Sequence, residues 1–228
     1  MMTFSKEMKG FTESLRLYRE TLEKKACQQE TSGFLYAFEH LLREASELIE
    51  AKAVFSHYGL LRGFCESVVM FECLLEHENE GSFEYYASYR GKVQSYFHTL
   101  DQGRTHPEND RPHQYDWYNG MKRGGFTTSK VSLKTLSNEA NKPLLKAFHI
   151  LNVKIHNAEF LLTHLKDGRS KNKEIENLKD TYLLVLNHIL RILRLYVDTP
   201  STKPILDSLL GKRNQMALMG EQKEKNLP

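Results

Sequence analysis

The sequence predicts an all-α protein, a single helical bundle of about six to seven helices with one long irregular loop. Three observations favour this fold class. Apolar residues recur every three to four positions over most of the chain, strict alternation is rare, and only 6 prolines interrupt the 228 residues. Because this length is below that at which two independent domains become the better prediction, we expect one compact domain with appendages.

The first third of the chain predicts three helices. Residues 5–28 have apolar side chains at helical spacing on an otherwise charged sequence, which indicates an amphipathic first helix. Thr31, Ser32 and Gly33 offer a helix stop and a new N-cap, so a second helix is expected from residue 34 almost to His57. Residues 58–78 are more apolar and predict a central third helix.

The rest of the chain predicts a tyrosine-rich helix over 83–100, followed by a long irregular loop over 101–128. This loop combines glycines and prolines with the single tryptophan, and loops of such length are often functional. Helices are then expected over 129–139, 142–166 and 173–197. The last is apolar nearly all round, which is typical of a helix in the centre of a bundle.

Proline positions suggest the domain organisation. We expect an N-terminal helix over 1–30, a helical-bundle core domain over 31–199, and a C-terminal tail over 200–228 that contains a short amphipathic segment. Pro200 and Pro204 mark the end of the core domain in this interpretation. Truncation after about residue 200 should then be tolerated.

Composition limits the cellular setting. The chain is 40% hydrophobic and 27% charged, as in ordinary globular proteins. Its longest apolar run, Tyr182–Leu186, is far shorter than the ~20 residues that span a bilayer, and the N-terminus lacks the pattern of a secretory signal. We therefore expect a cytoplasmic protein without a membrane partner. Cys27, Cys65 and Cys73 form no CxxC pair, which indicates reduced thiols rather than disulfides or a thiolate metal site.

Charge is distributed unevenly behind a net charge of +3. Residues 1–101 carry 11 Lys and Arg against 16 Asp and Glu, whereas residues 122–173 carry 11 against 3. A basic half predicts an acidic partner, either nucleic acid or the acidic half of a second copy in a homodimer. The alternative is a solvated helical face on which basic residues cluster by chance.

Arg62 and Glu66 are the first unusual polar positions. They lie four residues apart in the apolar stretch LLRGFCESVV, and Gly59 and Gly63 beside them would allow another backbone to approach closely. A buried ion pair is costly unless further hydrogen bonds complete it, so the pair predicts a specific polar network. This network is either structural or part of a functional site.

A second group of polar residues lies in AFHILNVKIHNAEF, where His149, Asn152, His156 and Glu159 form a stripe beside the apolar face. His149 and His156 are two turns apart, about 10 Å, so they cannot share one metal ion unaided, and no metal is predicted. No P-loop and no GxGxxG motif occurs, and no cofactor is expected. Acid–base chemistry remains, with His156 as the titrating group and Arg62 to stabilise phosphate charge.

The long loop contains YDWYNGMKRGGF, in which aromatic and basic residues are interleaved. Trp117, Lys122 and Arg123 are candidate RNA-binding residues there, because aromatic rings stack on bases and cations hold phosphates. His149 and Asn152 join this candidate set. The alternative for Trp117 is a structural role as an anchor that fixes the loop to the bundle.

These residues together resemble a bacterial all-helical family of unknown function over roughly residues 34–197. The features that carry the resemblance are the apolar helix with Arg62 and Glu66, the helix with Tyr85, Tyr86 and Tyr89, the loop with Trp117, and the helix with His156. That family is in turn similar to HEPN domains, the helical ribonucleases and RNA-binding modules of toxin–antitoxin and abortive-infection systems.

The resemblance implies RNA binding or metal-independent endoribonuclease activity in a defence or stress system, with Arg62, Glu66 and His156 as the catalytic candidates. HEPN nucleases carry Arg four to six residues before His on one helix. This spacing does not occur here, and Val153 stands where a small polar residue is expected. Arg62 would therefore have to act across helices. The sequence also leaves open a non-enzymatic adaptor that docks a protein partner, and a small-molecule sensor.

Overall fold

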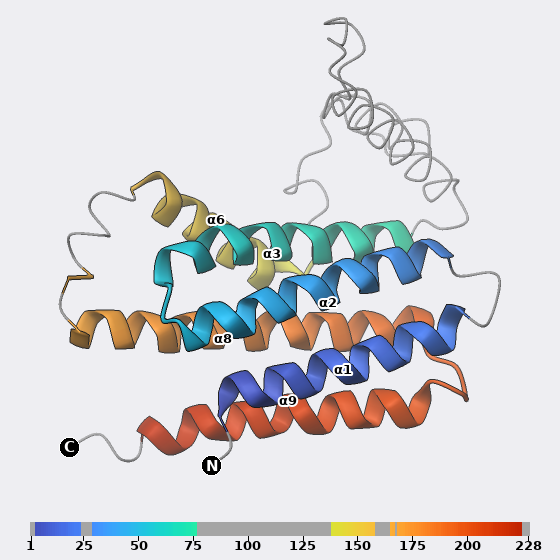
Figure 1. Cartoon of the computed structure of the whole chain (residues 1–228). Helices are drawn as coiled ribbons and strands as arrows, with labels where there is room; N and C mark the ends of the chain where they lie inside the picture. The colour runs from blue at the N-terminus through green and yellow to red at the C-terminus, as the bar shows by residue number, and fades with distance from the viewer. Residues whose placement is uncertain (1–2, 24–28, 77–137, 158–164, 167, 225–228) are drawn as a thin grey trace, which may run out of the picture. The chain divides into compact units, whose positions relative to one another are not determined.

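The structure is a computed structural model that describes residues 3–23, 29–76, 138–157, 165–166 and 168–224 (Figure 1). Within these ranges the chain forms six α-helices and one π-helical turn, and no strand is present. The prediction of an all-α fold is confirmed. The chain divides into two units, Met1–Phe71 with Asn138–Pro228, and Glu72–Ser137.

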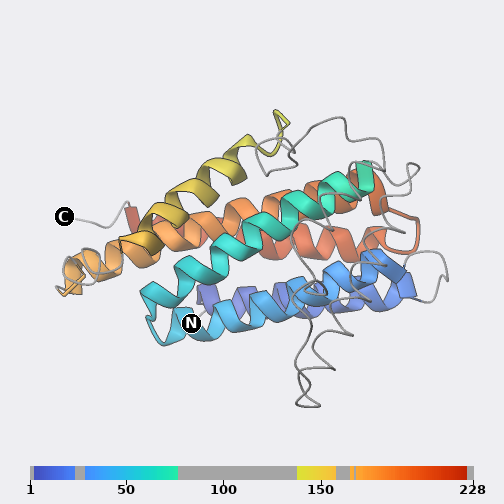
Figure 2. The same ribbon diagram turned by 90° about the horizontal axis from the view of Figure 1, so that it is seen from above.

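Helix α1 (Phe4–Glu23) lies between α2 (Gln29–Glu50) and α9 (Lys203–Glu224) and packs along both (Figures 1 and 2). Its apolar face is the one that the sequence spacing predicts. The buried large side chains on this face are Phe4, Met8, Phe11, Leu15, Tyr18 and Leu22. Fully burying side chains of this size contributes about 1.5–3 kcal/mol each, so α1 is a principal core element.

Polar contacts fix α1 to its neighbours. The Arg19 guanidinium donates to both carboxylate oxygens of Glu39 on α2, at 2.6 and 3.2 Å, although Glu39 is only 3% exposed. These hydrogen bonds raise the pKa of Arg19 above its usual value, so the pair remains ionised. On the other side, Lys212 of α9 donates to the buried Glu7 carboxylate at 3.4 Å.

Helix α3 (Val54–Glu76) packs against α2 through aromatic rings. Phe38 of α2 lies 5.4 Å from Phe64 and 5.6 Å from Phe71, and Phe34 stacks on Phe71 at 5.0 Å between ring centroids. Offset and edge-on ring pairs at these separations add to the free energy gained from burial alone. The Phe cluster therefore fixes α2 on α3.

Helix α8 (Gly168–Ile192) contacts both α9 and α6, and its end continues into a π-helical turn, η3 (Leu193–Val197). Tyr182 of α8 is fully buried, and its hydroxyl lies 2.7 Å from Nδ1 of the equally buried His57 on α3. At the far end, the Tyr18 hydroxyl of α1 donates to the carbonyl of Val197 at 3.1 Å. Both hydrogen bonds connect helices that are distant in sequence.

The turn between α2 and α3 differs from the expected boundary. Helix α2 begins at Gln29 and runs through residues 31–33, where the Ser32 hydroxyl donates to Glu23 of α1 instead of starting a new helix. It ends at Glu50, followed by Lys52 with φ of 52°. The amides of Lys52 and Ala53 donate to the carbonyls of Ile49 and Leu48, which is a Schellman C-cap. His57 therefore belongs to α3.

The C-terminal region also differs from the short amphipathic segment and tail expected over 200–228. It contains α9, a helix of 22 residues, whose Leu206, Leu209 and Met216 are buried. Pro204 does not end the fold, because proline is tolerated in the first turn of a helix. Since α9 covers α1, the expected tolerance to truncation after residue 200 has no support in this packing.

Several sequence predictions lie outside the described residues: the helices over 83–100 and 129–139, the loop over 101–128, and Glu159. Within the described ranges, no helix has the length and the apolar character to cross a membrane.

Candidate functional site

Helix α6 (Lys142–His156) carries most of the predicted site residues that the structure describes. Its start is fixed by a reciprocal pair, in which the backbone N–H of Asn138 donates to the Asn141 side chain at 2.9 Å and the Asn141 N–H donates to the Asn138 side chain at 2.8 Å. Pro143 follows in the first turn, where its missing N–H has no cost. No Asp or Glu occurs between Lys142 and His156, so the lysines of α6 have no acidic partner within this helix.

The side of α6 that faces α3 receives Arg62. The Nε atom of Arg62 donates to Oδ1 of Asn152 at 3.0 Å, and the guanidinium carbon lies 4.9 Å from the ring centroid of Phe148. The structure therefore brings Arg62 to the histidine-bearing helix, across 90 positions of sequence. The contact combines a hydrogen bond with a cation–π interaction, both on a half-buried side chain.

Glu66 and His156 do not take part in this contact. Among the described residues, Glu66 forms no hydrogen bond or ion pair, and the i,i+4 pair with Arg62 is not made. An i,i+4 ion pair on a helix is weaker when Arg precedes Glu. The guanidinium of Arg62 instead binds the side chain of Asn152 and lies over the ring of Phe148. His156 is exposed one turn beyond Asn152. The glycines that flank Arg62 are open, since a Cβ at Gly59 or Gly63 would meet no described atom within 4 Å.

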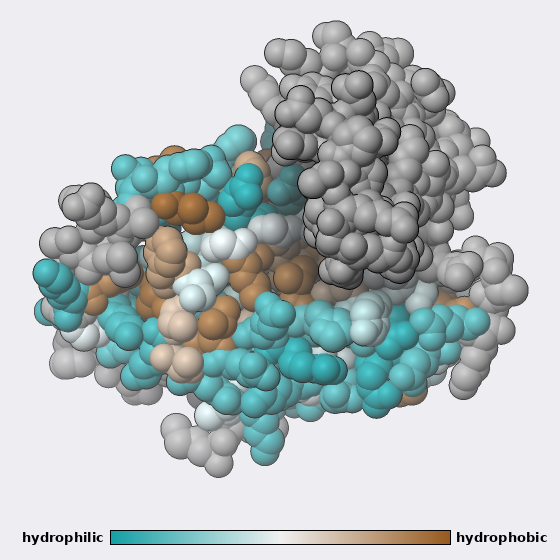
Figure 3. Space-filling model, turned by 45° about the horizontal axis from the view of Figure 1, so that its top comes forward, coloured by the Kyte–Doolittle hydropathy of each residue, from teal (hydrophilic) through white to brown (hydrophobic). Residues whose placement is uncertain are grey.

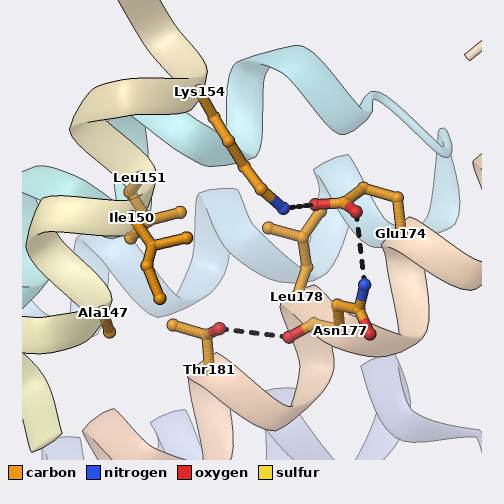
Figure 4. A pocket seen from close by; sticks show the side chains of 8 residues that line it. All are labelled: Ala147, Ile150, Leu151, Lys154, Glu174, Asn177, Leu178 and Thr181. Carbon is orange, nitrogen blue, oxygen red and sulfur yellow. Dashed lines mark hydrogen bonds and ion pairs between the residues drawn. The ribbon is translucent and has the colours of Figure 1, made fainter. Parts of the chain in front are cut away.

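The side of α6 that faces α8 borders a pocket of about 260 Å³ (Figure 4). The residues that line it come from both helices: Ala147, Ile150, Leu151, Lys154, Glu174, Asn177, Leu178 and Thr181. An ion pair between Lys154 and Glu174 lies at one end of this group (Figure 4). Asn177 donates its side-chain amide to Glu174 at 3.2 Å, and the Thr181 hydroxyl donates to the backbone carbonyl of Asn177 at 3.0 Å.

The Lys154–Glu174 pair also contacts α3, through the ring of Tyr58. The ammonium of Lys154 lies 5.2 Å from the ring centroid of Tyr58, whose side chain is fully buried. Burial raises the pKa of Tyr58, and the negative charge of Glu174 raises it further, so the phenol stays protonated. Two contacts between α6 and α3 thus place a cation near an aromatic ring: Arg62 over Phe148 and Lys154 over Tyr58.

The third side of α6 faces solvent. Its residues recur at spacings of four, three, four and three, which places them in one line along the helix: Lys142, Lys146, His149, Val153 and His156. All five are exposed. Lys142 pairs with the exposed Glu139, whereas Lys146 has no acidic partner within the described part of the chain. We call this line the solvent stripe of α6.

Hydrophobic side chains also reach the surface on α6, since Ile150 is 48% and Val153 is 60% exposed. Figure 3 shows hydrophobic surface gathered in the middle of one face of the molecule, between hydrophilic areas. Sequence reasoning missed the pocket beside Ile150, because the pairing of Lys154 with Glu174 has no local signal. The sequence offered one weak hint of a polar partner, which is that Lys154 stands three positions after the buried Leu151 and so on the same side of α6.

The remaining predictions concern the candidate RNA-binding residues and a metal site. Trp117, Lys122 and Arg123 lie outside the described residues. His149 is exposed, with its ring edge-on to Phe148 at 5.5 Å, and Asn152 binds Arg62. In the described part of the chain, no three His, Cys, Asp or Glu side chains are placed to hold a metal ion.

Comparison of the chain with known proteins gives no significant match to a family model, to a curated protein or to a solved structure. The resemblance to HEPN domains therefore stays a hypothesis that rests on the sequence.

Proposed function

We propose that the chain binds single-stranded RNA as a HEPN-like helical domain, with the solvent stripe of α6 as the contact surface. The observation that carries this proposal is the stripe itself, an exposed line of two lysines and two histidines on a helix without acidic residues. From Lys142 to His156 the line is about 21 Å long at 1.5 Å per residue, which is enough for several consecutive phosphates.

Positive charge continues beyond α6. Arg169, Lys171 and Lys173 occupy the first turns of α8, directly before Glu174. Because Glu174 pairs with Lys154 near the end of α6, the first turns of α8 lie near the C-terminal end of α6. A basic surface that extends over two helices suits the phosphate backbone, whose electrostatic attraction provides most of non-specific nucleic-acid affinity.

The geometry favours binding over cleavage. General acid–base cleavage of RNA needs a titrating group and a cation at the same phosphate. Here His156 is exposed on the stripe, whereas Arg62 is held on another side of α6 by Asn152 and Phe148. Metal-independent endoribonuclease activity is therefore the weaker form of the proposal, and a role in defence or stress is what the HEPN resemblance implies.

Fluorescence anisotropy with a labelled single-stranded RNA, titrated at several salt concentrations, tests the proposal. We expect the logarithm of the affinity to fall linearly with the logarithm of the salt concentration. Lys146→Ala should weaken binding and reduce this slope by about 0.7, the value for one lost phosphate contact on a single strand. The matched control is Lys203→Ala, which removes an exposed lysine from α9.

Two results would contradict the proposal: no binding to RNA at low salt, or an equal loss of affinity in both lysine variants. Cleavage is followed in the same samples by gel electrophoresis in the presence of EDTA. If the wild-type protein forms cleavage product and both His156→Ala and Arg62→Ala form none, the function is catalysis and not binding alone.

An adaptor that binds a protein partner is the second candidate, and the exposure of Ile150 and Val153 favours it. An apolar helix face that docks in a groove gives affinity that changes little with salt. A partner bound through these two residues would therefore be retained at high salt, where RNA is released.

A further inference from the structure

We propose that the pocket between α6 and α8 receives one unstacked base of the RNA strand that lies along the solvent stripe. This inference rests on the proposed RNA-binding function and deepens it, because it specifies single-stranded RNA whose bases are free to leave the stack. Bases inside a duplex are not available to such a pocket, whereas those of single strands can be splayed out.

The pocket opens beside the stripe. Ile150 lines the pocket and is also 48% exposed, so it belongs to the rim. It stands four positions after Lys146, which places it next to this lysine on the helix surface. A strand with a phosphate on Lys146 would therefore have its bases close to Ile150 at the rim of the pocket.

The size of the pocket suits a single base. Its volume of about 260 Å³ lies just below the ~300–1,000 Å³ of pockets that hold whole drug-sized ligands. The apolar residues of the lining are aliphatic: Ala147, Ile150, Leu151 and Leu178. Such side chains pack well against the faces of a flat ring, and they give no hydrogen bonds that would demand one particular base.

The polar residues of the lining keep both kinds of hydrogen-bonding capacity. The Thr181 hydroxyl uses its proton on the Asn177 carbonyl, which leaves its oxygen able to accept. A carboxylate can only accept, so the amide nitrogen of Asn177 must face Glu174 and its oxygen stays an acceptor. The ammonium of Lys154 has three protons and donates one to Glu174. Base edges combine donors and acceptors, which matches this set.

A substitution that fills the pocket tests the inference. Ala147→Leu places a larger side chain in the lining, and Ala37→Leu makes the same change at an exposed position of α2 as the control. Binding is measured to a single-stranded oligoribonucleotide and to inorganic polyphosphate, which carries phosphate charge without bases. We expect Ala147→Leu to weaken RNA binding about tenfold, because the pocket can no longer receive the base, and to leave polyphosphate binding unchanged.

The outcomes separate the two proposals. If wild-type protein binds RNA with the expected salt dependence and Ala147→Leu binds it equally well, the base pocket is wrong and the RNA-binding function stands. If neither RNA nor polyphosphate binds, both proposals are wrong. If Ala147→Leu weakens RNA and polyphosphate alike, the effect is on the stripe and the base pocket is again wrong.

A second variant covers the case in which Ala147→Leu does not fold. Thr181→Val removes the hydroxyl from the pocket with little change in shape, and its melting temperature is measured first. We expect a loss of RNA affinity of about two- to fivefold, as for one lost hydrogen bond, with polyphosphate binding unchanged. An RNA affinity equal to that of the wild type in this variant would overturn the inference.

Discussion

Helices α1 and α6 are held in the bundle by different means. Helix α1 buries large apolar side chains along its whole length and is covered on two sides by α2 and α9. Helix α6 buries only Leu144, Leu145 and Leu151, leaves Ile150 and Val153 exposed, and is held by polar contacts to α3 and α8. Regions with few buried apolar contacts open more readily than the core, so the proposed binding helix is also the less firmly held one.

The largest effect is expected from removing the cover of α1. A chain truncated after residue 200 loses the buried Leu206, Leu209 and Met216 of α9, and it exposes the face of α1 beneath them. At about 1.5–3 kcal/mol for each buried side chain, the loss is roughly 5 kcal/mol or more, comparable to the whole stability of many domains. Circular dichroism and urea denaturation check this, and a truncated chain as stable as the full one would contradict the packing.

A matched pair of substitutions compares the two helices directly. Leu15→Ala removes a fully buried side chain from α1, and Leu151→Ala removes a nearly buried one from α6 beside the pocket. We expect a destabilisation of about 4 kcal/mol for Leu15→Ala and about 2 kcal/mol for Leu151→Ala, because the site on α6 relaxes more easily. Equal losses in chemical denaturation would remove the distinction between the two regions.

The stability of the core should depend on pH through two buried histidines, His57 on α3 and His188 on α8. Burial lowers the pKa of His57 and of His188 to about 4, against 6.5 in an exposed chain. Between pH 6.5 and pH 4 the unfolded chain thus binds one more proton at each histidine than the folded chain. The free energy of unfolding should fall as the pH falls through this window, by about 3 kcal/mol for each histidine, and the histidine contribution should level off below pH 4.

Urea denaturation at successive pH values measures this dependence. The control is His57→Phe, in which the slope of stability against pH should be smaller by about one proton. A slope unchanged in this variant would show that His57 also binds its proton in the folded state.

A smaller and more local effect is expected at the contact between α3 and α6. Asn152→Ala removes the acceptor of Arg62 and should cost about 1 kcal/mol, because the half-buried guanidinium keeps its place on Phe148 and gains water. Hydrogen exchange should become faster in α6 and stay unchanged in α1. The control is Asn172→Ala at an exposed position of α8. Faster exchange throughout the bundle would mean that α6 opens only with the whole fold.

The smallest effect concerns the turn between α2 and α3. Lys52 adopts the left-handed conformation at the C-cap, which costs a residue with a Cβ about 1–2 kcal/mol. Lys52→Gly relieves this strain but gives the unfolded chain more freedom, so we expect a net gain of about 0.5 kcal/mol. A rise in melting temperature of about 1–2 °C checks it, and a fall would indicate that the lysine side chain contributes to packing.

The sequence predicted those parts of the fold that depend on local periodicity. The apolar face of α1 was readable from its spacing, since a helix that covers a core must repeat every three to four residues. The predictions at residues 31–33 and at Pro204 were wrong. A Ser–Gly pair or a proline is typical of a helix end, but each can also occur inside a helix when its side chain has another partner or when it lies in the first turn. Here Ser32 binds Glu23 on the neighbouring helix, and α9 begins with the proline in its first turn.

The candidate site was predictable only in part for the same reason. Arg62 and Asn152 could be singled out separately, as polar side chains on or beside apolar faces. Their hydrogen bond could not be deduced, because it depends on how two helices cross. The pairing of Lys154 with Glu174 was missed altogether, since partners on different helices share no spacing in the chain.

The π-helical turn η3 shows how much can depend on one residue. Such a turn accommodates one residue more than an α-helical turn does, and one residue corresponds to a rotation of about 100° around the helix axis. The carbonyl of Val197, which accepts the Tyr18 hydroxyl, lies at the end of this turn, and α9 follows shortly after it. A deletion of one residue within η3 would restore a regular helix and turn the exit of the chain away from α1. The position of α9 against α1 therefore depends on the number of residues in the turn that ends α8.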